Sequence, residues 1–483
     1  MQGLKGRAAG GGALAILLHT HMPYVEGFGT WPFGEEWLWE AMATCYLPLL
    51  DLLDAGAPLT ISLTPVLCDQ FEADGISDRF TRFVREVRAY THREDARGLR
   101  EGGYEQLARE LDRSLTDYVE AGQRLADRGG DMLAAFAPHA QWTSSATHAV
   151  LPLLATEAGL RAQVQTGIDS HRARFGESWQ GGFWLPECAH APWIEPALLD
   201  AGVRSTCMEL TSHFGLGAAE HLRPLRTSAG ITLLPIDRQT ISLVWSDGGY
   251  PAHGGYRDYH RHTVHHHNPW SNDGGDYDHD AALRLAAAHA ADFVAAVRAR
   301  LAGAREQAGA PLPQGGLVVC ALDTELLGHW WYEGLAWLAA VVQECERQEL
   351  PLLRLDEALE RCEPAPVDTE RWDQSSWGAG GDLSTWSSPA VQEIAFAQRA
   401  AELRLLRCDA LGARRAALRE LMAMQSSDWA FMLAREQAAV YARRRFEGHC
   451  EEFELALVGE AAGSEERLRN LAVHAEPRLL ALA

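Results

Sequence analysis

The stretch Phe183-Trp184-Leu185-Pro186-Glu187-Cys188-Ala189 reads as a short apolar strand that stops at a proline and then presents one carboxylate. A second apolar run, residues 316–322 (GLVVCAL), is likewise followed by an acid, Asp323. The carboxyl ends of parallel strands meet at one rim of a barrel. The two stretches therefore predict that Glu187 and Asp323 face each other at the mouth of a parallel β-structure.

Further apolar runs alternate with helical patterns along the first three quarters of the chain. Helical spacing of apolar residues occurs in residues 35–55, 151–162 and 280–302. Apolar strands that alternate with helices are typical of a parallel sheet that is covered on both faces and closed, or nearly closed, into a barrel. The runs expected to form strands are 13–18, 59–67, 132–137, 182–185, 204–208, 231–236, 316–322 and 351–355.

The domain organisation follows from changes in this pattern. We expect a barrel over residues 10–360, interrupted at about 78–130 by an Arg- and Glu-rich helical insertion. Residues 361–388 contain Ser, Gly and Trp and are expected to form a loop or linker. Residues 389–483 have almost no strand signal, which predicts an α-helical C-terminal domain. The fold class is thus α/β, followed by helices.

Composition excludes several function classes. The chain has 483 residues, with 43 Lys+Arg against 66 Asp+Glu. This excess of negative charge argues against binding to nucleic acid or to an anionic membrane. Nine cysteines without a C-x-x-C pair argue against a disulfide framework or a zinc ribbon. The apolar run at residues 13–18 is too short for a signal peptide or a membrane span. We expect a cytoplasmic enzyme.

The two acids suit glycoside chemistry. A retaining glycosidase places two carboxyl groups about 5–5.5 Å apart, one to attack the anomeric carbon and one to move a proton. Pro186 stiffens the approach to Glu187, as a fixed nucleophile requires. The alternative is that Glu187 and Asp323 each cap a helix, which is common after a strand.

Histidines follow the first predicted strand directly. His19 and His21 are two residues apart, so in an extended chain both rings face the same side and reach the barrel mouth. His148 is a third candidate. These rings could bond sugar hydroxyls or hold a metal ion, and the sequence leaves both open. The His-rich segment between His253 and His279 is expected to be a solvated loop rather than a metal cluster.

Three aromatic residues and one acid complete the candidates. Adjacent indoles in a helix cannot share a face, so one of Trp330 and Trp331 is expected in the core and the other beside a ligand. Trp377 lies in a Ser- and Gly-containing loop. Asp428 precedes a helical pattern and could simply cap it.

With these residues assembled, the chain resembles glycoside hydrolase family 57, and within it the 1,4-α-glucan branching enzymes. The resemblance implies an incomplete (β/α)7 barrel with a helical insertion and a helical C-terminal domain. It implies that Glu187 is the nucleophile and Asp323 the proton donor, and that glucan contacts come from His19, His21, His148, Arg261, Gly275, Trp377 and Asp428. Of the two adjacent indoles, we expect Trp330 to be the one that binds substrate. The matching segments are residues 19–24 (HTHMPY), 63–65 (LTP), 184–189 (WLPECA), 321–331 (ALDTELLGHWW), 375–378 (SSWG) and 425–429 (QSSDW).

The implied reaction cleaves an α-1,4-glucan and transfers the segment to a 6-hydroxyl, without metal or other cofactor. One departure concerns the acceptor. Branching enzymes of this family carry a tyrosine on a mobile loop, but this chain has no Tyr between Tyr118 and Tyr250. An α-amylase, a 4-α-glucanotransferase, a metal-dependent hydrolase and a non-catalytic glucan-binding protein are the alternatives. The sequence leaves the oligomeric state open.

Overall fold

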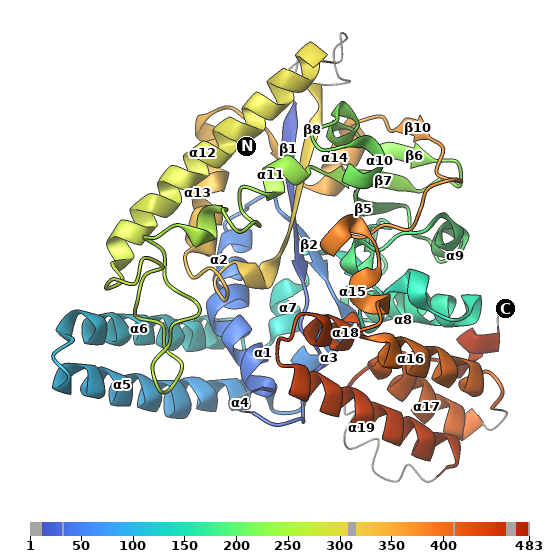
Figure 1. The fold of residues 1–483 in the computed structure, drawn as a ribbon, viewed down its shortest axis with the longest axis horizontal. Helices are drawn as coiled ribbons and strands as arrows, with labels where there is room; N and C mark the ends of the chain where they lie inside the picture. Colours follow the sequence, from blue (N-terminus) through green and yellow to red (C-terminus); the bar gives the residue numbers. More distant parts are fainter. Residues whose placement is uncertain (1–11, 31–32, 308–314, 409–410, 460–469, 482–483) are drawn as a thin grey trace.

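The computed structural model describes residues 12–30, 33–307, 315–408, 411–459 and 470–481 (Figure 1). At its centre lies a sheet of mostly parallel strands that curls round toward itself, with helices packed on its outer face. No helix in the described part of the chain is both long and apolar enough to cross a membrane.

Seven parallel strands form the curled sheet, in the order β4-β3-β2-β1-β8-β7-β5. A bridge between Gly182 and Ser205 brings the ends of this series together, beside β4 and β5. This architecture confirms the expected incomplete (β/α)7 barrel. The strands are β1 (Ala13–Thr20), β2 (Thr60–Leu63), β3 (Ala140–Ser144), β4 (Phe183–Trp184), β5 (Ser205–Glu209), β7 (Thr232–Ile236) and β8 (Leu317–Asp323).

The strand junctions differ in strength. β1 and β8 are in register along their length, from Ala13 beside Leu317 to His19 beside Asp323. Both strands are buried almost throughout, which explains their continuous apolar sequences. By contrast, β7 and β8 pair through the single position Ile236 beside Val319. The β7–β8 junction is therefore weaker than the β1–β8 junction. Three short strands add to this sheet: β6 (Leu225–Thr227) beside β7, β9 (Leu352–Leu353) beside the first half of β1, and β10 (Ala365–Val367) beside β6.

Helices cover the barrel and extend from it. In Figure 1 the paired helices α5 and α6 project to one side of the barrel, within the segment where the sequence predicts an insertion. The helices of the barrel region include α2 (Leu47–Asp54), α3 (Pro65–Phe71), α4 (Ile76–Arg82), α5 (Ala89–Glu101), α6 (Glu105–Asp127), α8 (Glu157–Phe175), α9 (Glu195–Asp200), α12 (His279–Gln307), α13 (Gly334–Arg347) and α14 (Leu355–Arg361).

Two strand predictions are wrong. Residues 132–137 form the helix α7 (Met132–Phe136), because the Asp131 side chain accepts a hydrogen bond from Ala134 N and caps it. The strand expected there is β3, which begins at Ala140. Residues 64–67 also leave the second predicted strand, since Pro65 starts α3 at a position where a missing N–H costs nothing.

The chain ends in a helical region with its own apolar core, as the sequence predicts. Leu421, Trp429 and Phe446 are buried in that core, which also includes Val150 and Ala189 from the barrel side. Figure 1 places these helices beside α8. They are α15 (Ser384–Ser387), α16 (Gln392–Leu405), α17 (Leu411–Met424), α18 (Ser427–Ala434) and α19 (Ala439–Leu457).

Candidate active site

Glu187 sits at a strained backbone position in the turn that follows β4. Its φ of 61° and ψ of 21° lie in the left-handed region, and the following Cys188 has a φ of 49°. Non-glycine residues in this region are uncommon and are held there by their surroundings. Here Cys188 N donates to Leu185 O at 2.8 Å, which closes a tight turn at Pro186. The turn fixes the direction of the Glu187 side chain.

Two donors hold the Glu187 carboxylate. Trp377 Nε1 donates to Oε2 at 3.0 Å, and Ser427 Oγ donates to Oε1 at 2.8 Å. Trp377 N also donates to the Glu187 carbonyl oxygen at 3.0 Å. Burial raises the pKa of Glu187, whereas these two side-chain donors oppose that rise. Each oxygen of this acid is therefore oriented by one hydrogen bond that favours the ionised form.

Asp323 has a different environment at the end of β8. Among the residues that the structure describes, no side chain donates a hydrogen bond to it. Burial, followed by the charges of Glu325 and Glu187, raises its pKa well above the usual value. Burial also raises the pKa of Glu325 to about 7, although Tyr46 Oη donates to this acid at 2.6 Å. Burial, together with the two neighbouring acids, thus favours the protonated form of Asp323.

The three predicted histidines lie together on the rim that carries the acids. His19 is level with Asp323 across the β1–β8 pair, and its ring stacks on Trp184 at 4.6 Å between centroids. His148 stacks on His21 at 3.9 Å, and its Nε2 lies 2.9 Å from His19 Nε2. The curl of the sheet therefore brings residues from β1, from the segment after β3 and from the turn after β4 to one rim.

The histidines differ in charge. Burial, with the nearby His21, lowers the pKa of both His19 and His148 well below the usual value. Burial also acts to lower the pKa of His21, but the Asp428 carboxylate, helped by Glu325 and Glu187, outweighs it and raises the pKa. His21 Nε2 lies 3.1 Å from Asp428 Oδ1. The cluster thus combines two rings in which burial favours the neutral form with one ring whose cationic form is favoured by acids.

A metal ion was one interpretation of this cluster. Ligand atoms of His21, His148 and Asp428 lie within 4.8 Å of one another. However, His21 Nε2 is bonded to Asp428, and the two nitrogens of His148 contact His19 and Ser427. These side chains thus satisfy one another's hydrogen bonds, and a metal ion or a sugar hydroxyl would have to displace one of these bonds to reach a ring nitrogen.

Aromatic side chains border the acids. Trp331 is buried while Trp330 is 41% exposed, which confirms that one of the pair packs in the core. Trp330 stacks on Tyr259 at 5.2 Å. Trp377 is partly buried and packs edge-on against Trp184 at 4.9 Å. Exposed or partly exposed indoles next to acids suit the apolar faces of sugar rings.

Arg261 and Gly275 lie in the His-rich loop, and their described contacts are within it. Arg261 Nη1 donates to Gly274 O at 3.1 Å, and its guanidinium lies over the Trp270 ring. Gly275 N donates to Asp273 Oδ1 at 3.0 Å. No described contact joins either residue to Glu187 or Asp323.

The expectation of a solvated His-rich loop is only partly met. Its tip is docked on α5, where Asp95 accepts hydrogen bonds from Thr263 Oγ1 and from His265. His267 is buried and its ring packs against His92 at 3.8 Å. The loop is held by the buried Asp95 of α5, and the sequence of the loop alone does not reveal this partner.

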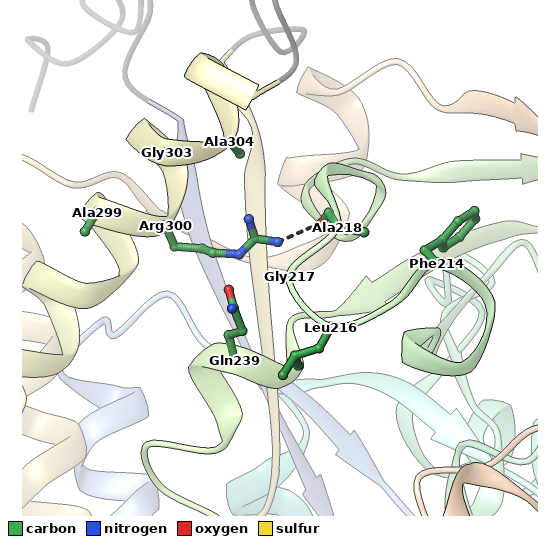
Figure 2. Close-up of a pocket in the computed structure, with 9 residues that line it drawn as sticks. All are labelled: Phe214, Leu216, Gly217, Ala218, Gln239, Ala299, Arg300, Gly303 and Ala304. Atoms are coloured by element: carbon green, nitrogen blue, oxygen red, sulfur yellow. Dashed lines mark hydrogen bonds between the residues drawn. The ribbon is translucent and has the colours of Figure 1, made fainter.

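A cavity of about 430 Å³ lies away from the acids, between α12 and the segment after α10 (Thr211–Phe214). Figure 2 shows Arg300 reaching across it, where the guanidinium donates to Ala218 O at 2.7 Å. None of the predicted site residues lines this cavity. The candidate site is therefore the acid-bearing rim.

Sequence reasoning missed two residues of that rim. Ser427 bonds Glu187, and Glu325 accepts from Tyr46 and from His21 N at 3.2 Å. Ser427 directly precedes Asp428, and Glu325 lies two residues after Asp323. Closeness in sequence to a predicted site residue was therefore the available signal.

Comparison with known families matches two segments of the chain. Residues 142–369 match the model described as glycosyl hydrolase family 57. Residues 394–476 match the model described as the C-terminal domain of 1,4-alpha-glucan branching enzyme. The first segment contains Glu187 and Asp323, and the second contains Ser427 and Asp428.

Whole-length relatives agree with these matches. A 1,4-alpha-glucan branching enzyme from Thermococcus kodakarensis is 31% identical over 92% of this chain and 73% of its own length. A probable 1,4-alpha-glucan branching enzyme from Mycobacterium tuberculosis is 30% identical over 95% and 94%. The crystal structure of a branching enzyme from Pyrococcus horikoshii has a TM-score of 0.88 at 28% identity, covering 97% of this chain and 96% of that one.

Proposed function

This chain belongs to glycosyl hydrolase family 57, and on that premise we propose that it is a 1,4-α-glucan branching enzyme working through Glu187 and Asp323. The observation that carries the assignment of roles is the contrast between the two acids. Glu187 is held by two donors, whereas Asp323 is surrounded by other carboxyl groups. An ionised nucleophile and a protonated acid are what a retaining mechanism requires.

In the first step Asp323 gives its proton to the glycosidic oxygen, and the bond from that oxygen to the anomeric carbon breaks. The Glu187 carboxylate forms a covalent bond to the anomeric carbon, and a chain with a free 4-hydroxyl leaves. In the second step the Asp323 carboxylate takes the proton of a 6-hydroxyl. The 6-oxygen attacks the anomeric carbon, Glu187 is released as a carboxylate, and an α-1,6 branch results.

The remaining residues are assigned to sugar binding. His19, His21 and His148 lie on the rim that carries the acids, and Asp428 fixes His21. Trp377 donates a hydrogen bond to Glu187 and packs edge-on against Trp184. Trp330 offers an exposed indole. Arg261 and Gly275 are assigned to outer glucan contacts from the family pattern, supported by the exposure of Arg261.

The acceptor decides between branching and its alternatives. Water would make the chain an α-amylase, and a 4-hydroxyl would make it a 4-α-glucanotransferase. Within the stretch that lacks tyrosine, residues 119–249, α10 carries His213, which stacks on Trp372 at 4.3 Å. The match to a branching-enzyme C-terminal domain supports the 6-hydroxyl. Nine free cysteines, most of them buried, support a reducing, cytoplasmic location.

Linkage analysis tests the proposal. The protein is incubated with amylose, and new α-1,6 linkages are counted against new reducing ends. We expect α-1,6 linkages to form in excess, in a chelator-insensitive reaction that Glu187→Gln abolishes. Reducing ends alone would assign an amylase, redistributed α-1,4 chains a 4-α-glucanotransferase, loss of activity with chelator a metal-dependent hydrolase, and binding without turnover a glucan-binding protein.

A further inference from the structure

One hydroxyl from the helical C-terminal region contacts the proposed nucleophile. Ser427 is the first residue of α18 and is 2% exposed. Its Oγ lies 2.8 Å from Glu187 Oε1 and also 2.8 Å from His148 Nδ1. The Ser427 hydroxyl therefore bridges the His148 ring and the Glu187 carboxylate.

The direction of each hydrogen bond can be derived. An ionised carboxylate only accepts, so the one proton of Ser427 points to Glu187 and His148 Nδ1 must donate to Ser427. Because burial keeps His148 neutral, its Nε2 then carries a lone pair. His19 Nε2, 2.9 Å away, must be the donor of that contact. His19 is also neutral, so its Nδ1 accepts from Ser62 Oγ at 3.3 Å.

We propose that Ser427 is a positioning residue: it is the last link in a chain of donors, Ser62 to His19 to His148 to Ser427, that converges on Glu187 Oε1. This inference rests on the proposed role of Glu187 as nucleophile. Hydrogen bonds that point the same way polarise one another, so the last bond is stronger than an isolated one. The chain orients one oxygen and favours the ionised carboxylate that attack requires.

The segment that carries Ser427 is fixed from both sides. Ser427 N donates to His148 O at 3.1 Å, so backbone and side chain of the two residues are paired. Thr147 Oγ1 donates to Met422 O at 2.6 Å. Gln163 Nε2 donates to Gln425 Oε1 at 2.9 Å. The hydroxyl is thus presented by a segment that is hydrogen-bonded to the barrel at three neighbouring points.

Other titratable groups also act on Glu187 and set the background for a pH test. The Asp428 charge raises its pKa and the His21 charge lowers it. The groups that face Glu187 or exchange charge effects with it are His21 just after β1, His148 before α8, Cys188 of the same turn, Asp323 of β8 and Asp428 of α18. Since Ser427→Ala alters none of these charges directly, a change in pH profile reports the lost donor.

The test compares Ser427→Ala with wild type and with Ser427→Thr, which keeps a hydroxyl. Loss of a hydrogen bond to a charged group predicts a fall in kcat/KM of roughly 10- to 100-fold. The acid limb of the kcat/KM profile is expected to move up by about one pH unit, because Glu187 is then harder to ionise. Ser427→Thr should restore both. Ser62→Ala should shift the limb in the same direction, by less.

Ser114→Ala is the matched control, since the hydroxyl of this buried serine of α6 donates to the Leu111 carbonyl in its own helix and has no other hydrogen-bond partner among the described residues. It should leave the profile unchanged. An unshifted acid limb in Ser427→Ala would overturn the proposal, even if activity fell. If Ser427→Ala fails to fold, Ser62→Ala decides in the same way. Failure of the proposed function would instead appear in the linkages made by wild type.

Discussion

Glu187 and Asp323 are both acids at the ends of buried strands, but the protein holds them in opposite ways. Asp323 ends the seven-residue β8, in the best-paired part of the sheet. Glu187 follows the two-residue β4 on a left-handed turn, and two side chains from distant parts of the chain orient it. One acid takes its position from regular structure and the other from a local turn with tertiary support.

The different surroundings of Glu187 and Asp323 show how two acids on one rim can differ in their tendency to ionise. Hydrogen bonds to a carboxylate favour its charge, whereas burial beside other acids opposes it. Burial raises the pKa of both acids, but only at Glu187 do side-chain hydrogen bonds oppose the rise, whereas at Asp323 neighbouring acids add to it. Because the two groups influence each other, their titration belongs to the pair, and the distinction between them is best tested by changing one environment at a time.

The largest expected effect comes from removing each acid in turn. Both Glu187→Gln and Asp323→Asn should lower activity on amylose by about 10³-fold or more, since each blocks a step of the double displacement. A donor with a fluoride leaving group needs no protonation. Asp323→Asn should therefore still form the covalent intermediate from it, as detected by mass spectrometry, while Glu187→Gln should not. Equal behaviour of the two variants would contradict their assigned roles.

A smaller effect is expected at Glu325. Its charge helps to raise the pKa of Asp323, so Glu325→Gln should lower that pKa and move the basic limb of kcat/KM to lower pH by about one unit. Glu333→Gln is a matched control, because Glu333 is also buried but accepts from Arg257 N outside the rim. An unmoved basic limb in Glu325→Gln would show that burial alone protonates Asp323.

The smallest effect concerns stability. Glycine adopts the left-handed turn at residue 187 without strain, so Glu187→Gly should be more stable than Glu187→Ala by about 1 kcal/mol. Thermal unfolding of the two variants measures this. At Asp323, on a regular strand, the order should reverse, because glycine weakens strands. The same stability order at both sites would remove the structural contrast between the acids.

The sequence predicts the position of Asp323 at the end of its strand better than it predicts the groups that surround Glu187. The barrel, the helical end and the two acids follow from apolar runs and their endings. The pairing of His148 with Ser427 joins positions 279 residues apart, which no local pattern encodes. The prediction for residues 132–137 fails because a capping aspartate outweighed an apolar run. The docked His-rich loop escaped notice because its partner, Asp95, lies on α5.

The order of these parts along the chain has a consequence for biosynthesis. Both acids and all three histidines have been synthesised by residue 323, but the donors to Glu187 arrive only at residues 377 and 427. Chains grow from the N-terminus and fold domain by domain. A nascent barrel on the ribosome would therefore hold the Glu187 carboxylate without either donor until the later segments have been made and have docked.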